Sequence, residues 1–255
     1  MKTILIALAV VCCASLASSA QHKIDGLPKG AVVLESRPLS SATHPNRSLV
    51  LWMINPKRNP VTEGPDDQYT CPTQTRGSYY SGPANVSLID PAKDKVINSV
   101  KVASYDSEDG DLDLPYAIRR GYYYRVDKVN LKTTQGKPTI LWLRDYNGDG
   151  KALEFALFDA PACMGLQTAL IGYSDSQDKV IRYPIRLAIK ENGKNSTETL
   201  YWADYLFDQK AKRPGHWVYE IDYRGRGGSL DKWEVNYNPI KEQFEGQVTR
   251  ITDEP

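Results

Sequence analysis

Residues Leu170-Ile-Gly-Tyr173 lead across a polar turn into Asp178-Lys-Val-Ile181. Runs of β-branched and aromatic residues on both sides of a turn predict a β-hairpin. Two other segments have the same arrangement: Val86-Ser-Leu-Ile-Asp90 leads to Asp94-Lys-Val-Ile97, and Tyr219-Glu-Ile-Asp222 leads to Asp231-Lys-Trp233. Three hairpins of one kind predict a protein that is built from antiparallel strands.

Short runs of this composition fill most of the chain, with turn residues between them. We expect strands at residues 31–34, 48–54, 85–89, 96–103, 122–129, 139–143, 154–158, 168–173, 180–189, 200–207, 217–223, 233–237 and 247–251. This pattern predicts an all-β fold, either a single β-sandwich or an open barrel of about 12–13 strands. Residues 198–210 alone allow a short helix, since Leu200, Ala203 and Phe207 can share one helical face. Strands do not alternate with long helices, which argues against a nucleotide-binding sheet.

The N-terminus has the three parts of a secretory signal peptide. Lys2 precedes an apolar run, and small residues lead to Ser18-Ser-Ala20 before Gln21. The run is shorter than the ~20 apolar residues that a membrane span needs. We therefore expect a signal peptide at residues 1–20, no membrane span, and a secreted or periplasmic mature chain. Residues 21–255 are expected to form one β-rich domain with a loose N-terminal arm.

The mature chain is expected to carry no formal net charge. The whole sequence has 32 Lys and Arg against 31 Asp and Glu, and Lys2 leaves with the signal peptide. A neutral chain has no global field that attracts nucleic acid or an anionic membrane. The tract Arg224-Gly-Arg-Gly-Gly228 is therefore interpreted as a turn, and no nucleic-acid partner is expected.

Two cysteines, Cys71 and Cys163, remain after the signal peptide is removed. An even pair in an oxidising compartment predicts one disulfide. A nucleophile and a metal thiolate are the alternatives, but neither cysteine has a second Cys or a His at ligand spacing.

The strongest chemical motif is an acidic loop that runs from Asp145 to Glu154. Asp145, Asn147 and Asp149 alternate along the chain and a glycine follows them, which is how loops present oxygen ligands to a hard cation. The backbone carbonyl of Lys151 adds a further oxygen. The loop therefore predicts a Ca²⁺ site.

Residues Asp145 to about Glu154 resemble the DxNxDG calcium loops of EF-hands, dockerins and FG-GAP/VCBS-type repeats. The likeness implies calcium ligation by the residues named above. It departs from the family pattern at the ninth and twelfth positions, which hold Leu153 and Ala156 in place of acidic ligands. Glu154, the tenth residue, substitutes only if the backbone leaves the helical path. The alternative is an ordinary Asn-Gly and Asp-Gly hairpin turn.

A second acidic loop precedes the first. Its five carboxylates lie within eight residues and repel one another unless water or a cation neutralises them: Asp106, Glu108, Asp109, Asp111 and Asp113. We interpret them as a possible second cation site, with an exposed solvated turn as the alternative.

Enzyme motifs are sparse, whereas aromatic residues with polar tips are abundant. His22, His44 and His216 lie in no serine-hydrolase or zinc-protease motif. Sixteen Tyr and five Trp suit polar-tipped cores and faces that stack on sugars or peptides. We expect a secreted, calcium-stabilised, non-catalytic β-domain that binds an extracellular carbohydrate or peptide. The alternative is a calcium-dependent extracellular hydrolase that uses the loop carboxylates.

Overall fold

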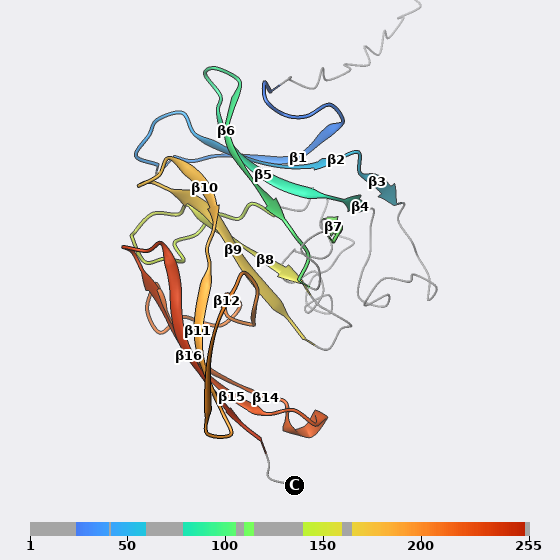
Figure 1. Cartoon of the computed structure of the whole chain (residues 1–255). Helices are drawn as coiled ribbons and strands as arrows, with labels where there is room; N and C mark the ends of the chain where they lie inside the picture. The colour runs from blue at the N-terminus through green and yellow to red at the C-terminus, as the bar shows by residue number, and fades with distance from the viewer. Residues whose placement is uncertain are drawn as a thin grey trace, which may run out of the picture.

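The computed structural model describes residues 24–40, 42–59, 79–105, 110–114, 140–159 and 165–252. Its regular elements within these ranges are β-strands and one 3-10 turn, η2 (Arg224–Arg226), with no α-helix. The strands form separate sheets, and none of the described sheets closes into a barrel (Figure 1). The predicted all-β fold is confirmed.

The first sheet is antiparallel and has the order β1-β2-β5-β6. Its strands are β1 (Ala31–Pro38), β2 (Ser48–Ile54), β5 (Ala84–Asp90) and β6 (Lys95–Val102). A small sheet at its end joins β3 (Lys57–Asn59), β4 (Tyr79–Gly82) and β7 (Leu112–Leu114).

The middle sheet is built around β9 (Gln167–Ser174). β8 (Glu154–Asp159) pairs with one edge of β9, while β10 (Lys179–Arg182) and β13 (Ala203–Asp204) pair with its two ends. The third sheet has the order β12-β11-β16-β15-β14. It comprises β11 (Ile185–Glu191), β12 (Lys194–Leu200), β14 (His216–Asp222), β15 (Leu230–Asn238) and β16 (Gln243–Ile251), with β11 and β16 parallel.

The three large sheets stack in layers because the middle sheet is apolar on both faces (Figure 1). Side chains alternate between the faces of a strand. Phe155 and Leu157 of β8 pack in the cluster shared with the first sheet, whereas Ala156 and Phe158 pack in the cluster shared with the third. Full burial of such a side chain contributes about 1.5–3 kcal/mol. A polar side chain in β8 therefore weakens one of the two interfaces.

Polar contacts join the edges of the first and middle sheets. The Asn98 amide on β6 donates from Nδ2 to the Val180 carbonyl (2.8 Å), and its Oδ1 accepts from the Val180 amide (2.9 Å), as a peptide group does in a ladder. Arg47 donates from Nε and Nη2 to the two carboxylate oxygens of Asp178 (2.8 and 2.6 Å). This forked pair lowers the pKa of Asp178 to about 2.

The three predicted hairpins are confirmed as β5–β6, β9–β10 and β14–β15. In the first two, Asp94 (φ +50°) and Asp178 (φ +49°) adopt the left-handed conformation just before the second strand. The segment that allowed a helix, residues 198–210, forms the end of β12, the short β13 and a turn. The strand predicted at 139–143 is wrong, because residues 140–143 lie in no strand and only Arg144 forms an isolated bridge, to Glu154. The strand predicted at 122–129 lies outside the described residues. The run 180–189 is divided into β10 and β11, because Pro184 lies between them and has no amide hydrogen for a ladder.

Candidate functional site

The acidic loop is held in shape by its own side chains. Asp145 accepts hydrogen bonds from the amides of Gly148 (Oδ1, 2.7 Å) and Gly150 (Oδ2, 3.0 Å). Asn147 Oδ1 accepts from the amide of Asp149 (2.9 Å), and Asp149 Oδ1 accepts from the amide two residues further on (2.8 Å). Short polar side chains thus satisfy four backbone donors of the turn.

Glu154 lies beneath this loop and is completely buried. Its Oε2 accepts a hydrogen bond from the amide of Tyr146 (3.0 Å), and its Oε1 accepts one from Asn147 Nδ2 (3.1 Å). Burial raises the pKa of Glu154 to about 8, and the nearby charges of Asp149 and Asp145 act in the same direction. This carboxyl group anchors the loop to the start of β8.

The carboxylates of the loop do not gather around one point. No group of three His, Cys, Asp or Glu side chains among the described residues has the arrangement of a metal site. Glu154 bonds to the inner side of the loop, while Asp145 bonds to amides of the turn. Calcium binding by Asp145, Asn147, Asp149, Lys151 and Glu154 stays a prediction.

Most of the other predicted positions lie outside the described residues: the segment 1–20, Cys71, Cys163, Asp106, Glu108 and Asp109. In the second acidic loop, Asp111 is exposed, and the backbone of Asp113 pairs with Ser81 between β7 and β4. The proposed disulfide and the second cation site therefore stay predictions.

The acidic loop packs closely against the turn that precedes β14. A Cβ atom on Gly148 (φ +82°) would lie 2.8 Å from the carbonyl oxygen of Pro214, and one on Gly215 (φ +74°) would lie 2.6 Å from the carbonyl oxygen of Asn147. Real Cβ atoms do not approach a backbone oxygen so closely. Glycine at both positions allows the two backbones to touch.

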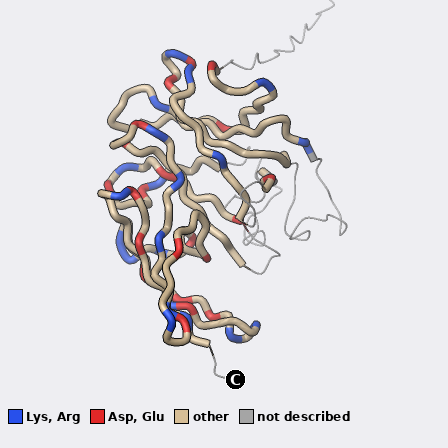
Figure 2. Tube along the Cα trace, in the orientation of Figure 1, with Lys and Arg blue, Asp and Glu red and all other residues tan. Residues whose placement is uncertain are grey.

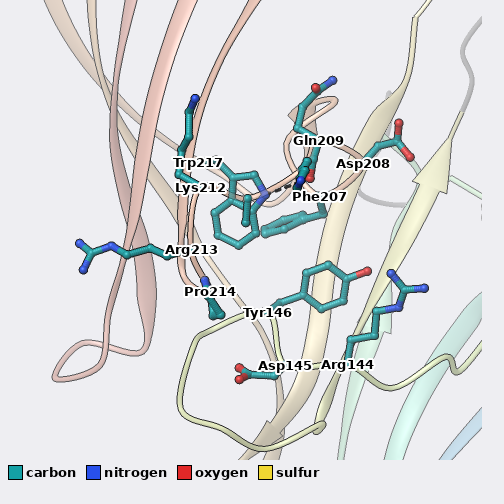
Figure 3. Close-up of a pocket in the computed structure, with 12 residues that line it drawn as sticks. Arg144, Asp145, Tyr146, Phe207, Asp208, Gln209, Lys212, Arg213, Pro214 and Trp217 are labelled. Atoms are coloured by element: carbon teal, nitrogen blue, oxygen red, sulfur yellow. Dashed lines mark hydrogen bonds between the residues drawn. The ribbon is translucent and has the colours of Figure 1, made fainter.

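A hollow of about 730 Å³ lies between the acidic loop and residues 207–214, and we call it the loop hollow (Figure 3). Three aromatic side chains line it: the Tyr146 ring meets the Phe207 ring edge-on (5.8 Å, 84°), and Phe207 meets Trp217 in the same way (5.6 Å, 88°). Trp217 Nε1 donates to the carbonyl of Gln209 (3.3 Å). Phe207 and Trp217 are each only 2% exposed, so they support the half-buried Tyr146 ring, which is the aromatic surface that the hollow presents.

Charges of both signs surround this ring. Lys212 and Arg213 extend away from the loop hollow, whereas Arg144 and Asp208 lie on one side of Tyr146 (Figure 3). The guanidinium of Arg144 stacks 4.5 Å from the centre of the Trp142 ring, which is 60% exposed. Arg144 at the edge of the hollow thus also covers an exposed ring that lies outside the lining of the hollow.

The sequence did not predict that three aromatic side chains would line one hollow. Tyr146 belongs to the acidic loop, whereas Phe207 and Trp217 come from a distant part of the chain. Their convergence depends on the contact between the acidic loop and the turn before β14. No local pattern marks such a contact.

Comparison of the chain with protein-family models, with curated proteins and with solved structures found no match. In the part of the chain that the structure describes, no helix has the length and apolar character for crossing a membrane.

Proposed function

We propose that this chain is an exported, non-catalytic β-domain that binds an extracellular peptide in the loop hollow. The observation that carries the proposal is the half-buried Tyr146 ring on its support of packed aromatic side chains, edged by the opposite charges of Arg144 and Asp208. Apolar side chains of a peptide suit this ring, and the polar and charged groups of the peptide suit the charges at the rim. The ~730 Å³ volume lies within the usual range of ligand sites, about 300–1,000 Å³.

The hydrogen bonding of the loop favours binding over hydrolysis. A general acid or base needs a carboxyl group that reaches the substrate. Both oxygens of Asp145 accept backbone hydrogen bonds, and Glu154 is buried beneath the loop. These carboxylates support the wall of the hollow, which argues against the hydrolase alternative.

We further propose that Ca²⁺ stabilises the acidic loop, which forms one wall of the loop hollow. The support for this is the alternation of Asp145, Asn147 and Asp149 in a turn whose two glycines, Gly148 and Gly150, have positive φ. An ion bound there would hold Tyr146 in place without touching the ligand.

A displayed library of random peptides, selected on the full mature chain, tests the proposal. We expect the selected peptides to lose at least tenfold in affinity with Arg144→Glu and with Asp208→Lys, since each reverses a charge at the rim. Lys190→Glu, an exposed change on β11, is the matched control and should leave affinity unchanged. Failure to select any peptide, or equal affinity for all variants, contradicts the proposal.

A further inference from the structure

A second hollow, of about 320 Å³, lies where the middle sheet ends and the third sheet continues. Gln167 begins β9 and pairs with Asp204, the last residue of β13. Both line the hollow together with Trp233 of β15 and Arg250 of β16. The third sheet extends past the end of the middle one there (Figure 1). We call this site the sheet-end hollow.

Two tyrosines at the sheet-end hollow are exposed. Tyr105 is 44% exposed and Tyr201 is 42% exposed, whereas the neighbouring Trp202 and Trp233 are buried in the wall. The guanidinium of Arg182 lies 4.3 Å from the centre of the Tyr201 ring and stacks on it. An exposed ring held by a cation presents a flat apolar surface of fixed orientation.

Polar groups of both kinds lie beside these rings. Gln167 Nε2 donates to Asp204 Oδ1, and Glu198 is a further lining residue of the hollow. Burial raises the pKa of Asp204. An amide, two carboxyl groups and a guanidinium offer donors and acceptors at close range. Such a mixture matches a ligand whose groups both donate and accept, as hydroxyls do.

The wall also contains two buried donors without partners. The indole Nε1 atoms of Trp202 and Trp233 have no hydrogen-bond acceptor in the described structure. An unsatisfied buried donor is costly, and structures contain few of them. Both atoms are buried beneath the surface of the wall, so they add to its polar character but do not themselves contact a ligand in the hollow.

Formal charge limits the kind of ligand. The lining residues include two basic side chains, Arg182 and Arg250, and two acidic ones, Glu198 and Asp204, so the two signs balance. Arg250 also lies near Asp231 (3.4 Å). Basic and acidic residues are likewise interspersed along the described chain (Figure 2). No excess charge favours an anionic or a cationic ligand.

We propose that the sheet-end hollow is a second binding site and takes a neutral sugar ring of an extracellular glycan. The apolar face of the sugar stacks on Tyr201, and its hydroxyls bond to Gln167 and Asp204. The volume of about 320 Å³ is at the small end of ligand sites and suits a short part of a glycan. This site is separate from the loop hollow and does not depend on peptide binding there.

Calorimetric titration of the full mature chain with neutral oligosaccharides tests the assignment. The probes are short oligomers of glucose, mannose, galactose and N-acetylglucosamine, with an acidic uronic-acid oligomer for comparison. We expect at least one neutral oligomer to bind. Tyr201→Ala should weaken that binding at least tenfold, Tyr201→Phe should retain it because the ring remains, and Gln167→Ala should weaken it through lost hydroxyl contacts.

Trp142→Ala is the matched control, because it removes an exposed ring that stacks with a guanidinium but lines neither hollow, and it should leave sugar binding unchanged. The melting temperature of each variant verifies its fold. The assignment is overturned if no neutral oligomer binds, if the acidic oligomer binds more tightly, or if Tyr201→Ala and Trp142→Ala weaken binding equally. If Arg144→Glu abolishes peptide binding but leaves sugar binding intact, the two hollows bind their ligands independently, and each proposal can be tested without the other.

Discussion

Two glycines of the acidic loop provide a matched test of how the loop is braced. Gly148 and Gly150 have nearly the same backbone conformation, with φ of +82° and +84°, and the amide of each donates to Asp145. They differ in surroundings: a Cβ on Gly148 would lie 2.8 Å from the Pro214 carbonyl oxygen, whereas a Cβ on Gly150 would meet nothing within 4 Å. Alanine at each position therefore separates backbone strain from steric contact.

The expected magnitudes follow from these two terms. A left-handed alanine costs about 1–2 kcal/mol, and the reduced freedom of the unfolded chain offsets about 0.4–1 kcal/mol of that cost. Gly150→Ala should therefore lower the free energy of unfolding by about 1 kcal/mol. Gly148→Ala adds a backbone collision, and forced overpacking costs a further ~1–3 kcal/mol. We expect a total loss of about 2–4 kcal/mol.

Urea unfolding at neutral pH, followed by tryptophan fluorescence, measures both variants against the unmodified protein. Gly148→Ala should also weaken peptide binding in the loop hollow, because the displaced loop carries Tyr146. Sugar binding at the sheet-end hollow should be unaffected. Equal destabilisation by the two alanines would refute the close contact between the loop and the turn before β14.

Three further changes test other parts of the structure. Asp178→Asn removes the forked arginine pair and should lower the free energy of unfolding at pH 7 by about 1 kcal/mol, since Asp178 is 27% exposed and partly screened. The pKa of Asp178 is depressed from 3.8 to about 2, so its contribution is present above about pH 4 and is lost as pH falls toward 2. Melting temperatures of Asp178→Asn should therefore fall less steeply over that range, and parallel curves would contradict this account. Calcium at about 100 times a dissociation constant of ~10⁻⁴–10⁻³ M should raise the free energy of unfolding by ~2.7 kcal/mol. The Asp145→Ala/Asp149→Ala double variant should lose that gain. If the melting temperature of the unmodified protein is the same with calcium and with chelator, the loop is an ordinary hairpin turn without a bound ion. Phe155→Ala in β8 should cost about 3–5 kcal/mol in urea unfolding, whereas a loss below 1 kcal/mol would show that the first and middle sheets do not share a core.

The strand pattern shows how much local sequence determines. Alternating β-branched and aromatic residues marked most described strands, and the Asp-Lys turns of two hairpins place an aspartate in the left-handed conformation that this residue tolerates. β12 was not expected, because its residues are polar and almost all exposed. Its pairing with β11 uses backbone hydrogen bonds, which leave no pattern in side-chain type.

The candidate sites show which features local sequence predicts and which it does not. The acidic loop was recognised from Asp145, Asn147 and Asp149, since its residues are adjacent and their turn chemistry is local. The complete burial of Glu154 depends on sheets that pack above and below β8, and these come from distant parts of the chain.

Sequence by itself determined the all-β class, the hairpins and the acidic turn, because each depends on residues within one or two strands. Only the tertiary structure decided that the middle sheet is covered on both faces and that the third sheet extends beyond it. The contact between the acidic loop and the turn before β14 brings Tyr146 to Phe207 at one hollow, and the end of the middle sheet brings Gln167 near Trp233 at the other. Contacts of this kind arise from the stacking of sheets, and residue periodicity along one strand carries no information about which sheet will face it.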